Sequence, residues 1–186
     1  MAPITYVYME LRYVVIALLL LLVILSGYTD LRARIIPNLV TYPAMLLGLA
    51  FNGILGGGAQ GGADGIISAS LGLFVGGAVF LPFFLTGGFE GGDVKLMAAI
   101  GSLGGLRFVI GAILLTALAG ALVAFVVILR SGAWRSTLRN LGRLLRFKQV
   151  EPPPGDAAPL TVPYGVAIAL GTIAAIAMEL GGRSLF

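Results

Sequence analysis

Two aspartates, Asp30 and Asp93, are the residues of this sequence best suited to chemistry. The chain contains no histidine and no cysteine, which excludes thiolate or imidazole metal sites, cysteine nucleophiles and Ser–His dyads. Any bond-breaking chemistry must therefore rely on carboxylates, lysine or tyrosine. Only 11% of the residues are charged, yet Glu90, Asp93 and Lys95 fall together in the glycine-rich stretch "GGFEGGDVKLMAAIG". Ionisable groups set in so apolar a sequence indicate a functional site.

A pair of aspartates has a definite chemical use. Two carboxyl groups that meet in a poorly solvated site cannot both ionise easily, so the pair retains one shared proton. The ionised member can activate a water while the protonated member polarises a peptide carbonyl, which is hydrolysis without a covalent nucleophile. Taken singly, Asp30 could mark a helix end at the membrane interface, and Asp93 could be the N-cap of the next helix.

The rest of the chain consists of apolar runs that would carry these acids. Of its 186 residues 59% are hydrophobic, and the mean hydropathy is +1.04. Runs of about 18 or more apolar residues are typical of membrane helices. We predict an all-α polytopic membrane protein that forms a single domain over residues 1–186. Its six spans are expected at 13–28, 39–55, 66–85, 94–106, 108–129 and 160–180.

The positions of the basic residues predict the topology. If all six segments cross, nine of the twelve Lys and Arg residues lie on one side and three on the other. If the short fourth segment did not cross, the split would be five and seven. Because positive charge favours the cytoplasm, we expect six spans in the inner membrane, with both termini outside. The loop at 131–159 would be a basic amphipathic segment on the anionic cytoplasmic leaflet.

This topology brings the two acids to the same face. Asp30 ends the first span and Asp93 begins the fourth, and the two spans between them lead out and back. The fourth span has only about 13 residues, or roughly 20 Å, so Asp93 should lie below the inner surface. Glycines before it allow positive φ angles and the close approach of a second backbone.

Three stretches resemble the prepilin peptidase family, whose members are membrane aspartyl proteases with a Gly–Asp motif. "DLRARIIPN" (30–38) resembles the segment of the family's first aspartate, and "GGDVKLMAAIG" (91–101) resembles that of its second. "TVPYGVAIALG" (161–171) resembles the opening of its last helix. The three stretches occur in the family's order and together span most of the chain.

The resemblance implies that Asp30 and Asp93 are the catalytic pair, with no cofactor and no metal. Members cleave basic leader peptides from prepilin or pseudopilin precursors at the cytoplasmic side, so the expected partners are such precursors and membrane lipids, and not nucleic acid. The expected supporting residues are Gly91, Gly92, Lys95, Pro37 and Asn38. Pro37 would end the loop and Asn38 would be the N-cap of the second span, while Lys95 would point away from Asp93.

Two departures from the family pattern affect the prediction. Glu90 stands where the motif usually has glycine, and we expect its carboxylate to face water. The chain also lacks the Cys-x-x-Cys motifs associated with N-methylation. We therefore expect a peptidase without methyltransferase activity, most similar to the short forms that serve Flp/Tad-type pili or to archaeal preflagellin peptidases.

Two other functions were weighed against this prediction. Presenilin-type proteases need a Tyr-Asp pair and a Pro-Ala-Leu motif, and neither occurs in the sequence. The non-enzymatic alternative is a small proton-coupled transporter or channel that uses Asp30 and Asp93 as a relay. An inverted repeat between the two halves would favour a transporter, and no convincing repeat is found.

Overall fold

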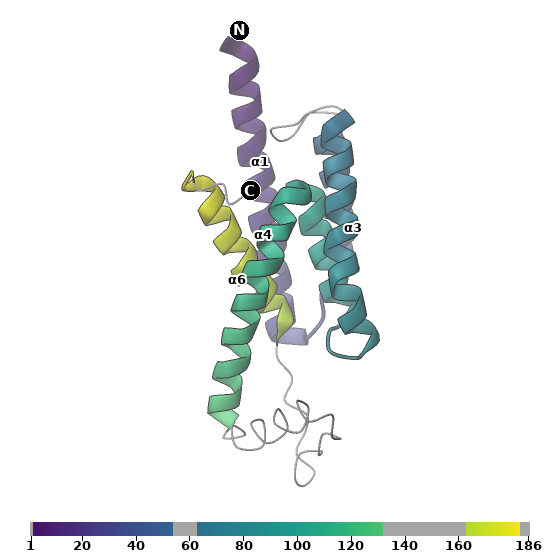
Figure 1. Cartoon of the computed structure of the whole chain (residues 1–186), viewed down its shortest axis with the longest axis vertical. Coiled ribbons are helices and arrows are strands. Elements are labelled where there is room, and N and C mark those ends of the chain that lie inside the picture. The colour runs from purple at the N-terminus through teal and green to yellow at the C-terminus, as the bar shows by residue number, and fades with distance from the viewer. Residues whose placement is uncertain (1, 54–62, 132–162, 183–186) are drawn as a thin grey trace. The chain divides into compact units, whose positions relative to one another are not determined.

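The computed structural model describes residues 2–53, 63–131 and 163–182, and the regular structure within these ranges is entirely helical (Figure 1). The helices are α1 (Ala2–Ala33), α2 (Asn38–Gly53), α3 (Ala63–Leu85), α4 (Gly91–Ser131) and α6 (Tyr164–Leu180). The predicted all-helical class is therefore confirmed. The expected basic segment at 131–159 lies outside the described residues apart from Ser131.

The chain divides into two compact units. One comprises Met1–Ala119 together with Pro163–Phe186, and the other comprises Gly120–Val162. The described part of the second unit is the end of α4, which is apolar up to Arg130. All residues of the candidate site belong to the first unit, so the packing described below concerns that unit alone.

Among the residues that the structure describes, three helical segments are long and apolar enough to cross a bilayer: Arg12–Ala33, Asp64–Leu85 and Gly91–Arg130. The chain is a membrane protein. Helix α1 is longer than the expected span at 13–28, because polar residues at both ends of the apolar run continue the helix. Helices α2 and α6, with 16 and 17 residues, are shorter. Six crossings and the orientation of the termini stay predictions.

Helix α4 reverses its direction at Gly105. The backbone there has φ 78° and ψ 178°, a conformation open to glycine but strained for residues with a Cβ. In Figure 1 the teal part of α4 rises to this turn and the following green part descends from it. The expected fourth and fifth spans, 94–106 and 108–129, correspond to these two legs. The break between the two legs falls at Gly105, inside the expected fourth span and two residues before its predicted boundary at 107.

Polar side chains from two neighbouring helices bind the backbone groups that this turn leaves unpaired. Asn52 of α2 donates from Nδ2 to the carbonyl oxygens of Ser102 and Leu103, each at 3.1 Å. The backbone N–H of Leu106 donates to Oγ of Ser68 in α3 at 3.2 Å. Because lipid cannot satisfy backbone groups, irregular backbone in a membrane protein needs such partners.

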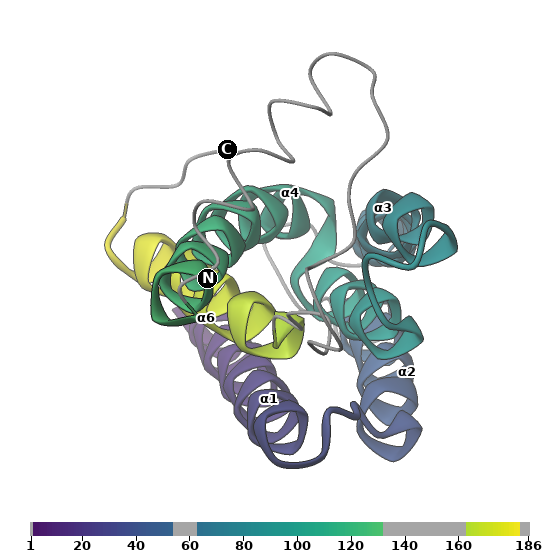
Figure 2. The ribbon, with the colours of Figure 1, turned by 90° about the horizontal axis from the view of Figure 1, so that it is seen from below.

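Close contacts between helices hold the bundle together. Helix α1 packs against α2 and α6, and α2 packs against α3; Figure 2 shows α2 between α1 and α3. Gly72 of α3 and Gly101 of α4 touch backbone to backbone, with no room for a Cβ on either. Small residues at such crossings are typical of membrane helices, which associate through close packing. Leu96 and Met97 of α4 are fully buried in the resulting core.

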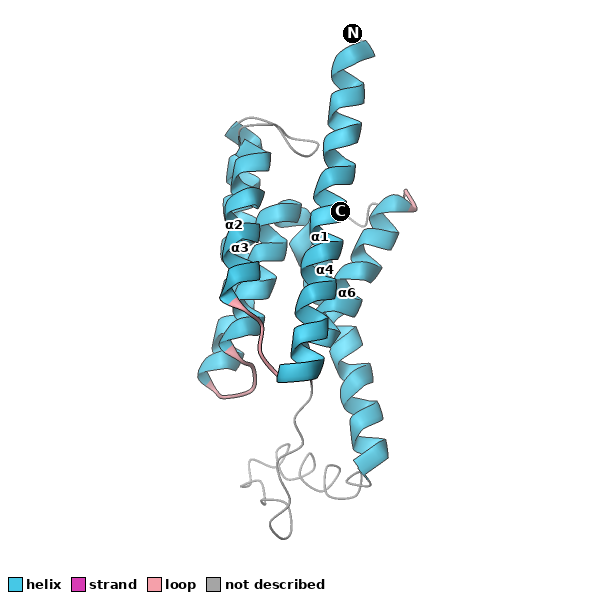
Figure 3. Cartoon of the chain, turned by 180° about the vertical axis from the view of Figure 1, so that it is seen from behind, coloured by secondary structure: helices cyan, strands magenta, loops and turns pink. Residues whose placement is uncertain are grey.

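The connections next to the two aspartates, residues 34–37 and 86–90, lie at one end of the bundle (Figure 3). Helix α1 ends at Ala33, and Arg34 takes a left-handed conformation with φ 55°. Its backbone N–H donates to the carbonyl of Asp30 at 2.9 Å. This reversal lets only four residues, 34–37, connect α1 to α2, which keeps Asp30 close to the start of α2.

Candidate active site

Asp30 lies in the last turn of α1 and is buried, with 6% of its surface exposed. Its Oδ2 atom is inaccessible and has no hydrogen-bond partner in the described part of the chain. Gly165, in the first turn of α6, packs directly on this side chain. A Cβ at position 165 would lie 2.9 Å from both Cβ and Oδ2 of Asp30, so only glycine fits there without displacement.

Asp93 lies in the first turn of α4, with 4% of its surface exposed. Its Oδ2 accepts the backbone N–H of Glu90 at 3.0 Å, while its own N–H donates to the Glu90 carbonyl at 3.1 Å. The first of these bonds, from the side chain of the third helical residue back to the N–H of the residue before the helix, is one half of a capping box. The alternative that made Asp93 the N-cap is therefore wrong in register, because α4 begins at Gly91.

The two acidic segments meet through Ile36 and Gly92. Ile36, in the connection after α1, is 7% exposed, and a Cβ on Gly92 would lie 2.9 Å from its Cβ. The absence of a side chain at Gly92 thus lets this connection lie on the first turn of α4. The carboxyl groups of Asp30 and Asp93 are close enough for their charges to interact. The structure therefore brings the two predicted acids together.

A hydrogen bond between Lys95 and Asn38 links the start of α4 to the start of α2. Lys95 donates from Nζ to Oδ1 of Asn38 at 2.9 Å, and its ammonium lies 5.4 Å from the ring centroid of Tyr42. Both of these partners belong to α2. The prediction that Asn38 is the N-cap of α2 is wrong. Asn38 is the first helical residue, its amide oxygen binds Lys95, and the preceding Pro37 carbonyl accepts the N–H of Val40 at 3.1 Å.

The remaining predicted residues, Glu90 and Gly91, have lesser roles in the packing. Glu90 is exposed, in line with the expectation that its carboxylate faces water. A Cβ on Gly91 would meet a ring carbon of Phe84 at 3.4 Å, an ordinary contact. Packing therefore requires glycine at position 92 and not at 91.

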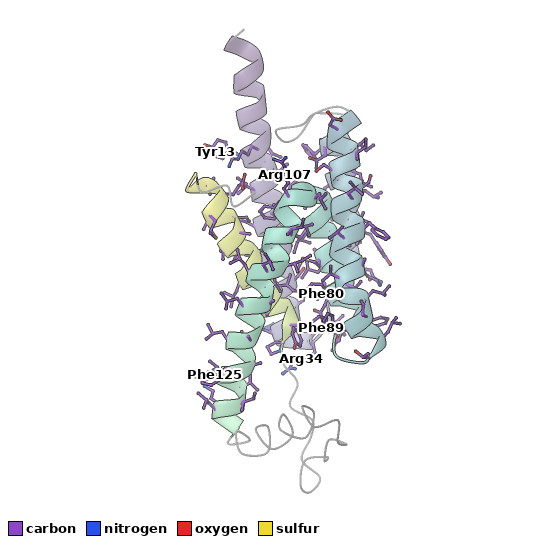
Figure 4. The ribbon with its side chains drawn as sticks, in the orientation of Figure 1. Tyr13, Arg34, Phe80, Phe89, Arg107 and Phe125 are labelled. Atoms are coloured by element: carbon purple, nitrogen blue, oxygen red, sulfur yellow. The ribbon has the colours of Figure 1, made fainter. Side chains whose placement is uncertain are left out.

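An aromatic cluster that the sequence reasoning missed surrounds Phe89, and Figure 4 labels two of its members, Phe80 and Phe89. Phe89, just before Glu90 in the loop, packs against Tyr164 of α6 with the ring centroids 4.2 Å apart in a T-shaped arrangement. Phe80 stacks on the ring of Phe89 with the centroids 5.0 Å apart, and the centroid of the Phe83 ring lies 5.2 Å from that of Phe89. The available signal was an aromatic residue within the glycine loop and the Pro-Tyr-Gly sequence that opens the last helix.

The donor groups of the site suit acid–base chemistry. Within the described ranges, no group of three or more acidic residues is arranged to hold a metal ion. The site offers two buried carboxyl groups on different helices, Asp30 and Asp93, and carboxyl groups can serve as general acid and general base. A helical membrane bundle with such a pair at one end has the arrangement expected of a membrane aspartic protease.

The sequence matches the type IV leader peptidase family over residues 16–125, more than half of the chain and a range that contains both aspartates. The chain belongs to this family. It is 37% identical over 117 residues to a prepilin leader peptidase/N-methyltransferase of Aeromonas hydrophila, and 33% identical over 119 residues to that of Xanthomonas campestris pv. campestris. The matches cover 61% and 62% of this chain and 40% of each relative. No solved structure matches the chain.

Proposed function

We propose that this protein is an aspartic endopeptidase that removes basic leader peptides from type IV prepilin-like precursors at the cytoplasmic side of the inner membrane. The observation that carries the proposal is the convergence of Asp30 and Asp93. They come from different helices, both are almost fully buried, and they lie within the segment that matches the family. Burial of two acids in a membrane bundle is costly and marks functional sites.

In the proposed mechanism Asp30 and Asp93 share one proton. The ionised carboxylate takes a proton from a water as the water oxygen attacks the carbonyl carbon of the scissile peptide bond. The protonated carboxyl group donates its proton to the carbonyl oxygen. Collapse of the tetrahedral intermediate breaks the C–N bond, and the departing nitrogen takes up the proton that came from the water. No covalent enzyme intermediate forms.

The orientation of the substrate follows from the charge distribution. The residues 29–38 and 86–93 belong to the side that carries nine of the twelve basic residues in the six-span topology, and positive charge favours the cytoplasm. A precursor whose basic leader stays in the cytoplasm while its apolar helix enters the bilayer would place the junction between them at this depth. The similarity to prepilin leader peptidase/N-methyltransferases supports a prepilin substrate.

The test is cleavage of a purified prepilin-like precursor by the full chain in lipid nanodiscs, followed by mass spectrometry. Asp30→Asn and Asp93→Asn should each abolish cleavage, by roughly a thousandfold or more, as expected when one member of a catalytic unit is lost. The amide of the Asp93→Asn variant can still accept the Glu90 N–H through its oxygen, so the start of α4 is preserved.

Asp64→Asn is the matched control. Asp64 is an exposed acid in the first turn of α3, so the same substitution there should leave the cleavage rate unchanged. Helical content measured by circular dichroism verifies that each variant is folded. Cleavage that persists in a folded Asp30→Asn or Asp93→Asn variant would refute the two-aspartate mechanism.

A further inference from the structure

The first turn of α6 touches the segments that carry both aspartates. Tyr164 places its ring against Phe89, at a centroid distance of 4.2 Å, in the loop whose next residue begins the reciprocal pairing with Asp93. The following residue, Gly165, packs on the side chain of Asp30. Two consecutive residues of one helix therefore contact two segments that are far apart in sequence.

We propose that Tyr164 and Gly165 are positioning residues that set the separation of the two carboxyl groups. Gly165 fixes how closely α6 approaches Asp30, because a methyl group there would collide with Cβ and Oδ2. Tyr164 contacts Phe89 and thereby holds the Phe89 loop, together with Glu90 and the first turn of α4, at a fixed distance from Asp30. The functional importance of this separation rests on the proposed function.

The surroundings of the Phe89 ring support a positional role. Phe89 is packed against Tyr164, Phe80 and Phe83 at centroid distances between 4.2 and 5.2 Å, and Phe80 is 5% exposed. The backbone of the loop is also fixed, since the N–H groups of Gly88 and Phe89 donate to the carbonyl of Phe83 at 2.8 and 3.3 Å. A loop held this firmly moves with the ring that anchors it.

The experiment measures the separation directly and does not depend on catalysis. Because the chain has no cysteine, Asp30→Cys and Asp93→Cys introduce its only two thiols. The full chain in nanodiscs is treated with a short reagent that reacts with two thiols, and the rate of internal cross-linking is followed by intact mass. We expect rapid cross-linking in this parent protein.

Removing the contact should slow the cross-linking. Tyr164→Ala, and independently Phe89→Leu, should lower the rate roughly three- to tenfold, the range expected for loss of one aromatic pair. Gly165→Ala should lower it similarly by displacing residue 30. Tyr164→Phe, which retains the ring, should cross-link at the parental rate. Tyr164→Ala and Phe89→Leu together should be no slower than the slower single variant.

Two controls separate position from general loosening. Gly27→Ala adds a methyl group in the same α1–α6 contact, but that methyl would lie 3.4 Å from Cβ of Ala169, an ordinary contact. Phe74→Ala removes a ring that is 69% exposed on α3. Both should cross-link at the parental rate. Equal rates in Tyr164→Ala, Gly165→Ala and the parent would overturn the proposal, as would a Tyr164→Phe rate that falls with Tyr164→Ala.

The same substitutions in the chain that retains both aspartates provide the activity readout. A change in carboxyl separation should lower kcat for precursor cleavage and leave KM nearly unchanged, because the substrate-binding surface is intact. Cross-linking that depends on Tyr164 in a protein whose Asp→Asn variants still cleave would refute the proposed mechanism while leaving the positioning role in place. If Tyr164→Ala leaves cross-linking unchanged while the Asp→Asn variants lose cleavage, the positioning role is refuted and the proposed mechanism is retained.

Discussion

Asn52 is the side chain on which the turn of α4 most depends, and we expect its replacement to destabilise the whole bundle. It is 6% exposed and donates from one nitrogen to three carbonyl oxygens, one in its own helix at 2.9 Å and two in α4 at 3.1 Å. Those two carbonyls lie just before Gly105, where the helical hydrogen-bond ladder stops. Asn52→Ala removes their partner.

The expected loss can be estimated from the two hydrogen bonds to α4. Interhelical hydrogen bonds in membrane proteins contribute about 0.6 kcal/mol on average and up to about 1.7 kcal/mol. Asn52→Ala should therefore lower the free energy of unfolding by about 1–3 kcal/mol. Asn52→Leu restores the volume but not the donor, so it should be nearly as destabilising. Ser68→Ala removes one bond to the same turn and should cost about half as much.

The assay is reversible unfolding in mixed micelles of increasing SDS fraction, followed by far-ultraviolet circular dichroism. Thr86→Val is the control, because the Thr86 hydroxyl is exposed and bonds only to carbonyls of its own helix end, those of Pro82 and Phe83. It should change the unfolding free energy by less than about 0.5 kcal/mol. An Asn52→Leu variant as stable as the Thr86→Val control would show that the turn does not need this partner.

Two further predictions concern the contacts around the acids. Gly92→Ala should lower precursor cleavage about tenfold, because the new methyl group would lie 2.9 Å from Cβ of Ile36 and push the connection away from α4. Ile36→Ala in the same chain should restore part of the activity. A lack of rescue would contradict this contact. Lys95→Met should lower the unfolding free energy by about 1 kcal/mol through loss of its bond to Asn38. In a double-mutant cycle, Asn38→Ala should add little to that loss, whereas full additivity would refute the link.

The helices were predictable because apolar runs in this chain are bounded by charged and glycine-rich stretches. The turn at Gly105 was harder to predict from the sequence. The predicted fourth and fifth spans, 94–106 and 108–129, are separated by Arg107 alone, and nothing in this pattern indicates that the backbone reverses at Gly105. The turn depends on tertiary contacts, because Asn52 and Ser68 form hydrogen bonds with its backbone that an exposed loop would form with water. The available signal was Asn52, a single polar residue near the end of the apolar run at 39–55.

The candidate acids were predictable from composition and topology, but their surroundings were not. With no histidine or cysteine in the chain, the choice of chemistry was narrow, and an even number of spans between Asp30 and Asp93 placed them on one side. The contacts of Tyr164 and Gly165 depend on how α6 crosses α1, which no local pattern encodes. Asn38 was misassigned for the same reason, since its amide oxygen is taken by a lysine from another helix.

The hydrogen bond between the Glu90 N–H and Oδ2 of Asp93 makes the two carboxyl groups mechanically unequal. Asp93 also lies in the first turn of α4, so rotation of its side chain would break the hydrogen bond to the residue before that helix. Asp30 has one oxygen with no such tether. In the proposed mechanism, one oxygen of Asp93 is therefore already bound to the backbone, whereas Oδ2 of Asp30 still has its hydrogen-bonding capacity to offer.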